Sequence, residues 1–132
     1  MIRIAHRGNI NGKEPELEND PDYLTGMFAR GYDVECDIRY VDGKYYLGHD
    51  YPKYETNAEF LKNKHFWCHA KDGTTLRQAL KDGLHCFFDN NPNASYTLTS
   101  KGYIWHWDGE NLVYVMDKNG LVGVCSDWVG LL

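Results

Sequence analysis

Acidic and imidazole side chains stand at the ends of apolar segments in the first half of the chain. They fall into three groups, His6-Arg7-Gly8, Glu35-Cys36-Asp37 and His49-Asp50. Residues i and i+2 of a strand point to one face, so Glu35 and Asp37 should project together. Two such carboxylates can hold a hard divalent cation, Mg²⁺ or Ca²⁺. Two nearby histidines would supply a general base and a general acid near neutral pH. Together the groups predict metal-assisted phosphodiester chemistry.

Each group taken alone has a simpler explanation. Glu-x-Asp fits a solvent-facing pair of acids on an amphipathic strand equally well, and either His6 or His49 alone fits a structural histidine. Only the joint pattern therefore points to an enzyme.

Apolar periodicity predicts the elements that must position these groups. Strands are expected over residues 2–6, 33–40, 45–48, 66–71 and 84–88, and helices over 21–30, 57–63 and 74–81. This order favours a parallel sheet. Beyond Asp89, strand-like segments at 102–107, 112–116 and 122–126 are separated by turns too short for crossover helices.

Composition limits the classes of function. The 132 residues contain no linker and predict a single domain over 1–132. A net charge of −5 with scattered basic residues argues against nucleic-acid binding. No apolar run is long enough for a transmembrane helix and no signal-peptide pattern is visible. The four cysteines form no CxxC pair, so we expect buried thiols in a reducing compartment and a cytoplasmic protein.

The three groups also occur in a family-like order. Residues 4–8, 31–37 and 42–50 carry His-Arg, Glu-x-Asp and His-Asp in turn, and Leu17-Glu18-Asn19 is similar to a Pro-Glu-Asn element after the first motif. Over residues 2–50 the chain resembles the glycerophosphodiester phosphodiesterases of the phospholipase C-like phosphodiesterase superfamily.

The resemblance implies a (β/α)₈ barrel with its site at the carboxyl ends of the strands. It implies a divalent cation, Mg²⁺ or Ca²⁺, on Glu35 and Asp37, with His6 and His49 as acid and base. Arg7 and Lys71 would bind the phosphate, Lys71 because residues 69–71 occupy the place of the family's acid-x-Lys motif.

The chain departs from the family at the third metal ligand, which falls on His69. Imidazole is a poorer ligand than carboxylate for Mg²⁺ or Ca²⁺. Three alternatives follow: two carboxylates with more water, a preference shifted to Mn²⁺ or Zn²⁺, or loss of the metal. Asp89 is a further candidate ligand.

The second departure is size, because such a barrel needs roughly 250 residues. Residues 103–105 and 123–127 resemble the family's later strands loosely. We therefore expect an α/β fold, a reduced TIM-like (β/α) barrel of about 7–8 strands that lacks several outer helices in its C-terminal half. The uncovered strand backs would be filled by large side chains or covered by a second subunit in a homodimer.

The expected activity is metal-dependent hydrolysis of a small glycerophosphodiester-type substrate by histidine acid/base catalysis. A lyase that releases a cyclic phosphate and a non-catalytic phosphate-binding remnant of the same fold are the alternatives. Trp105, Trp107 and Trp128 either cage a choline head group or pack in the core or an interface.

Overall fold

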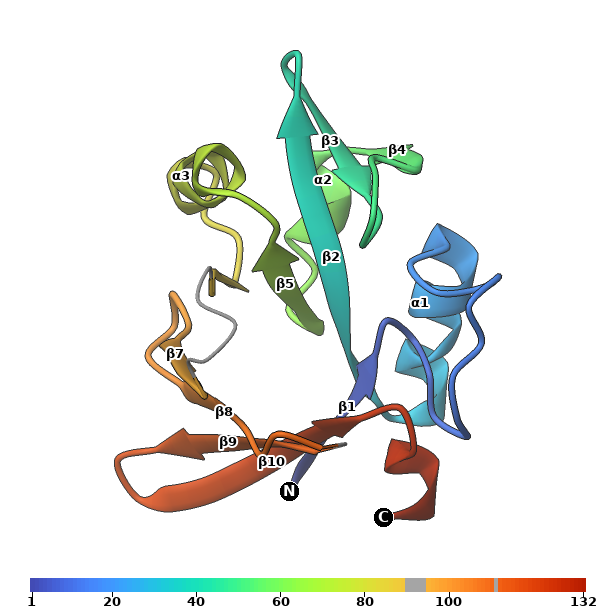
Figure 1. The fold of residues 1–132 in the computed structure, drawn as a ribbon, viewed down its shortest axis with the longest axis vertical. Coiled ribbons are helices and arrows are strands. Elements are labelled where there is room, and N and C mark those ends of the chain that lie inside the picture. The colour runs from blue at the N-terminus through green and yellow to red at the C-terminus, as the bar shows by residue number, and fades with distance from the viewer. Residues whose placement is uncertain (90–94, 111) are drawn as a thin grey trace.

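The computed structural model describes residues 1–89, 95–110 and 112–132. In this part of the chain ten strands form one curled, mixed sheet, a half-barrel with short helices outside it (Figure 1). The strands are β1 (Ile2–His6), β2 (Asp33–Val41), β3 (Lys44–Leu47), β4 (Tyr54–Thr56), β5 (Phe66–Ala70), β6 (Cys86–Phe87), β7 (Tyr96–Leu98), β8 (Ile104–Trp107), β9 (Val113–Asp117) and β10 (Gly120–Ser126). The helices are α1 (Pro21–Gly26), α2 (Ala58–Leu61) and α3 (Gly73–Lys81), with 3₁₀ turns at Phe28–Arg30 and Val129–Leu131.

The sheet changes character halfway round the curl. From β6 through β5, β2 and β1 to β10, all neighbouring strands are parallel. From β10 through β9 and β8 to β7 they are antiparallel, and β3 and β4 extend the far end of β2 as antiparallel hairpins. Parallel strands need long crossovers, whereas antiparallel strands need only turns.

The expected TIM-like (β/α) barrel is therefore wrong. Alternation of strand and helix stops at β6, and the later described strands are joined without crossover helices, so they pair antiparallel and the sheet is mixed. In the described residues, several backbone and side-chain hydrogen bonds join the two ends of the curl. Ser100 N donates to Cys86 O at 2.8 Å, and Thr97 Oγ1 donates to Phe88 O at 2.9 Å.

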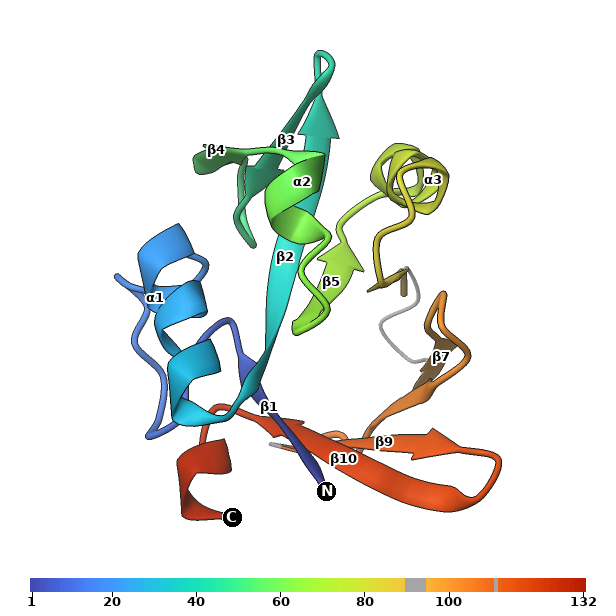
Figure 2. The same ribbon diagram turned by 180° about the vertical axis from the view of Figure 1, so that it is seen from behind.

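Two apolar clusters pack on opposite faces of the sheet. The outer cluster joins the strand backs to the three helices, which lie outside the curl in both views (Figure 2). The inner cluster fills the concave side with Ile4, Trp67, Phe87, Trp105, Val115 and Cys125. Strand alternation explains the division, because Ile4 points inward while its neighbour Ala5 belongs to the outer cluster. The inner cluster supports the floor beneath the polar residues described below.

The sequence predicted the local elements of the first half well. Asp20 caps α1 by accepting hydrogen bonds from the amides of Asp22 and Tyr23, Pro21 opens the helix, and Gly31 ends the following turn at φ 89°. All four cysteines are buried and free, as expected. None of the described helices is long and apolar enough to cross a membrane.

Candidate active site

Five of the predicted site residues are brought together where β1, β2 and β5 lie side by side. The parallel register places His6 beside Glu35 and Asp37 beside His69. Lys71 follows β5 directly, and its amide donates to Ile38 O at 3.1 Å, which continues the β2–β5 pairing. Strand alternation thus sets one polar row on the concave face of three adjacent strands.

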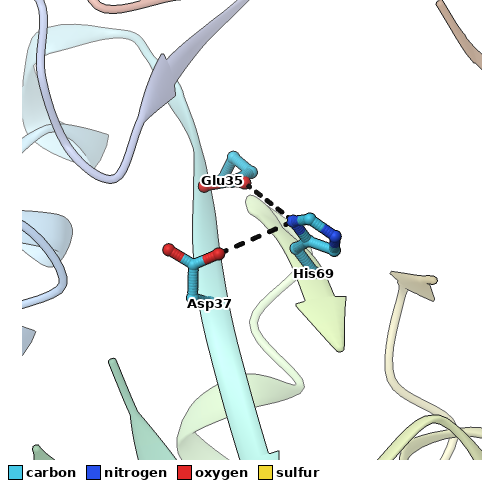
Figure 3. Close-up of side chains that lie close together, drawn as sticks. All are labelled: Glu35, Asp37 and His69. Carbon is cyan, nitrogen blue, oxygen red and sulfur yellow. Dashed lines mark ion pairs between the residues drawn. The ribbon is translucent and has the colours of Figure 1, made fainter. Parts of the chain in front are cut away.

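Glu35, Asp37 and His69 form a compact cluster (Figure 3). Nδ1 of His69 lies 3.7 Å from Glu35 Oε2 and 3.6 Å from Asp37 Oδ1. One potential ligand atom from each residue lies within 4.8 Å of the others, which is close enough to hold a metal ion. The imidazole is stacked on Phe87 at 4.8 Å between ring centroids with 13° between planes. Packing therefore fixes the ring with Nδ1 toward both carboxylates.

The two carboxylates are buried and incompletely satisfied. Glu35 is 2% exposed and Asp37 is fully buried. Glu35 Oε1 and Asp37 Oδ1 have no hydrogen-bond partner among the described residues. A buried carboxylate oxygen that accepts no hydrogen bond is costly, and a bound cation removes that cost. The donor set and its orphaned oxygens therefore fit a divalent cation.

Asp37 is also surrounded by fixed donors and cations. Its Oδ2 accepts a hydrogen bond from Asn19 Nδ2 at 3.0 Å and lies 3.1 Å from Arg7 Nε, while Lys71 Nζ lies 3.5 Å from Oδ1. The Asp37 amide donates to Asn19 Oδ1 at 2.9 Å. Burial alone would raise the pKa of Asp37, but the charges of Lys71, Arg7 and His69 outweigh it and lower the pKa. Asp37 is therefore ionised.

Arg7 is held in an uncommon backbone conformation. Its φ of 55° lies in the left-handed region, and Gly8 follows at φ 93°, where a Cβ would come within 2.6 Å of the Tyr23 ring. The turn directs the Arg7 guanidinium to Asp37 and, at 3.1 Å, to Glu18 Oε1. Arg7 and Lys71 contact acidic side chains in this structure. Their expected role in binding the substrate phosphate stays a prediction.

His6 is oriented by a carboxylate that sequence reasoning did not assign to the site. Its Nδ1 lies 2.8 Å from Asp127 Oδ1, which also accepts a hydrogen bond from Asn9 Nδ2 at 2.9 Å. Burial lowers the pKa of His6, but Glu35 and Asp127 outweigh it and the net shift is upward. The Ser-Asp ending of β10 was the available signal, because β10 runs parallel to β1.

Asn9 extends this network to the motif around Glu18. It donates to Glu18 Oε2 at 2.9 Å and accepts from the Tyr23 hydroxyl at 2.9 Å. Asn9 is fully buried, and Asn19 is 2% exposed. Glu18 and Asn19 thus support Arg7 and Asp37, a role that their place in the family-like pattern did not reveal.

His49 reaches the site from the β3–β4 connection. Gly48 donates its amide to Asp37 O at 3.0 Å, and the Arg39 guanidinium donates to the carbonyls of Gly48 and His49. Gly48 has φ 154°, and a Cβ there would meet Tyr51 O at 2.0 Å, so only glycine fits this turn. Nδ1 of His49 lies 2.7 Å from Asp50 Oδ1, and the histidine is half-exposed.

Two hollows open beside His6. The larger, about 540 Å³, is lined by both predicted catalytic histidines, Glu35, His69 and Lys71 on one side. Phe87, Trp105 and Trp107 form its aromatic wall. The smaller, about 420 Å³, is more polar and includes Lys13, Ser126 and Asp127, while His6 and Trp107 line both hollows.

The three late tryptophans do not form one cage. Trp105 is buried and stacks on Phe87 at 4.6 Å, and Trp107 is half-exposed at the hollows. The Trp128 ring lies against Gly12 instead, where a Cβ would come within 2.8 Å of it. Asp89 lines the larger hollow but is not part of the metal-ligand cluster found among the described residues.

Comparisons with protein-family models, with curated proteins and with solved structures find no match for this chain.

Proposed function

We propose that this protein is a metal-dependent phosphodiesterase that hydrolyses a small glycerophosphodiester-type substrate. The observation that carries the proposal is a shared cavity: His6 and His49, from separate parts of the chain, line the same hollow as Glu35 and His69. A general acid, a general base and a metal centre in one cavity are what phosphodiester cleavage needs.

Glu35, Asp37 and His69 would hold a divalent cation. When bound, the cation polarises a phosphoryl oxygen and neutralises charge that develops in the transition state. The two orphaned carboxylate oxygens support this assignment. Lys71, at the edge of the cluster, adds positive charge to the cavity in which the phosphate would lie.

The two histidines transfer the protons. One removes the proton of the attacking water or hydroxyl, and the other protonates the leaving alkoxide. Each has its Nδ1 paired with a carboxylate, Asp127 for His6 and Asp50 for His49. In both, this pairing leaves Nε2 for proton transfer. The arrangement supports the acid and the base separately, by Asp127 directly after β10 and by Asp50 in the β3–β4 connection.

The two hollows match the two ester groups of a phosphodiester. With the phosphate beside His6, one ester group would lie on the aromatic wall that includes Trp107, and the other would enter the hollow with Lys13 and Ser126. Their volumes, about 540 and 420 Å³, suit small substituents rather than a polymer.

The test is hydrolysis of glycerophosphodiesters and of a chromogenic diester, with added divalent cations or EDTA. His6→Ala and His49→Ala should each lower kcat by about 10²-fold or more. His106→Ala is the matched control, because His106 stacks on Tyr96 of the neighbouring strand β7 and does not line either hollow. Equal rates in all three variants, or no turnover with any cation, would contradict the proposal. Phosphorus NMR of the products separates hydrolysis from release of a cyclic phosphate.

A further inference from the structure

The ligand atoms of the Glu35-Asp37-His69 cluster bear on which class of metal ion the cluster binds. We infer that the cluster prefers a first-row transition ion that accepts imidazole nitrogen, such as Mn²⁺ or Zn²⁺, over Mg²⁺ and Ca²⁺. This inference deepens the proposed function by naming the class of its metal, and it rests on the metal centre of that proposal rather than on turnover.

The imidazole of His69, which supplies the nitrogen donor, is held in place beside both carboxylates. Nδ1 of His69 is nearly equidistant from the two carboxylates, at 3.7 and 3.6 Å. Stacking on Phe87 and pairing of β5 with β2 restrain the ring from two directions. An ion held between the two oxygens that face His69, Glu35 Oε2 and Asp37 Oδ1, therefore meets the imidazole as well as the two carboxylates (Figure 3). Imidazole suits Zn²⁺ and other transition ions, whereas Mg²⁺ and Ca²⁺ take oxygen ligands.

The oxygen count argues against Ca²⁺ in particular. Ca²⁺ takes six to eight oxygen ligands, frequently from bidentate carboxylates. Asp37 Oδ2 is already engaged by Asn19 and lies 3.1 Å from Arg7 Nε, so Asp37 has only Oδ1 to offer. A monodentate Asp37 leaves the cluster short of the oxygens that Ca²⁺ requires.

Positive charge near the cluster also weakens the binding of a metal ion that only the charge of the carboxylates attracts. Arg7 and Lys71 both lie within 3.5 Å of Asp37 oxygens and offset the charge of that carboxylate. A hard cation depends on carboxylate charge, whereas a transition ion gains additional stability from the nitrogen donor. Both arguments favour the same class of ion.

The experiment measures binding of each metal alone to the full chain, with no phosphodiester present. Calorimetric titration should give affinities for Zn²⁺ and Mn²⁺ at least 10-fold above those for Mg²⁺ and Ca²⁺, with Zn²⁺ tighter than Mn²⁺. A Cu²⁺ probe should show nitrogen superhyperfine splitting in its EPR spectrum that is lost in His69→Ala. His106→Ala should keep the splitting, since His106 lies outside the cluster.

Replacing the imidazole of His69 by a carboxylate separates the two classes of ion most clearly. His69→Asp should lose Zn²⁺ affinity by at least 10-fold and gain affinity for Mg²⁺ or Ca²⁺, with folding checked by circular dichroism. Mg²⁺ or Ca²⁺ bound by the unaltered chain as tightly as Zn²⁺ would overturn the inference, and that measurement needs no variant. Tight Zn²⁺ binding by a protein that cleaves no diester would support the inference and contradict only the proposed reaction.

Discussion

Asp37→Asn tests whether the buried carboxylate is the counter-charge that holds Arg7 and Lys71 in the site. The substitution keeps the size of the side chain and removes its charge. Asp37 is fully buried, and the side chains of Arg7 and Lys71 are 21% and 16% exposed. Without the charge of Asp37, these two mostly buried cations lose the negative charge that both of them contact.

Breaking a buried ion pair by removing one partner costs about 3–5 kcal/mol. Arg7 keeps Glu18 as a second partner at 3.1 Å, so we expect the substitution to lower the free energy of unfolding by the lower end of that range, about 3 kcal/mol. The acid dependence should change too. Since the folded pKa of Asp37 is lowered from 3.8, its charge stabilises the fold above that pH, and the stability is lost as pH falls through the folded pKa. The variant should lack this part of the acid transition.

The assay is urea denaturation in EDTA, so that no bound metal contributes. Asp42→Asn is the control, because Asp42 is exposed in a turn at φ 51°, which asparagine also adopts, and its effect should stay within about 0.5 kcal/mol. Adding Lys71→Met to the Asp37→Asn background should recover about 1 kcal/mol or more, because it removes the uncompensated cation. A loss below 1 kcal/mol in the single variant, or no recovery in the double variant, would refute the reasoning.

Four further outcomes follow from the site and the core. Asp127→Asn should lower kcat by about 10²-fold with metal affinity unchanged, since it disturbs the hydrogen bond to His6 Nδ1 but no metal ligand; equal loss of metal binding would contradict this role. Gly48→Ala should lower activity at least 10-fold in an assay of kcat, because a Cβ would lie 2.0 Å from a backbone oxygen and would displace the turn that carries the histidine base or acid. Trp107→Leu should raise KM for diesters with an aryl group by several-fold and leave KM for methyl esters unchanged, as its ring lines both hollows. His85 has a pKa lowered by burial to about 4, so the unfolded chain binds its proton first and stability should fall by about 2 kcal/mol as pH drops from 6.5 to about 4; His85→Gln should flatten that dependence in chemical denaturation.

Local patterns predicted most elements of residues 1–88, whereas the architecture did not follow from them. The expected strand over residues 2–6 has its expected boundaries, and the expected helix over 21–30 is present as the shorter helix α1, which ends at Gly26, followed by a 3₁₀ turn at Phe28–Arg30. Strands β4 and β7, of three residues each, were not predicted, because so short a segment carries no readable periodicity. The barrel expectation came from the family resemblance, and it is wrong because the short turns visible in the sequence between the later strands allow only antiparallel pairing of β7–β10.

Local geometry predicted the candidate site only where one strand carries two of its residues, whereas His6, His69 and Lys71 were assigned to it through the family resemblance. Glu35 and Asp37 follow from strand alternation alone, and the structure places them together. Asp127 lies 121 positions from His6, and Asn9 lies 118 positions from Asp127, so no local pattern reports either contact. Only the parallel pairing of β10 with β1 brings them together.

The same pairing explains how a chain of this length supports the site. Every residue of the metal cluster and its cations follows or lies in β1, β2 and β5, which are the strands covered by helices on the outer face. The later strands contribute an interior of large rings, with Trp105 between Phe87 and Trp67 at ring-centroid distances of 4.6 and 5.8 Å, and Asp127 directly after β10 contacts His6. Aromatic side chains on the concave face thus bury the inner surface of strands that are covered by no α-helix among the described residues, so this part of the C-terminal half lines the cavity with rings instead.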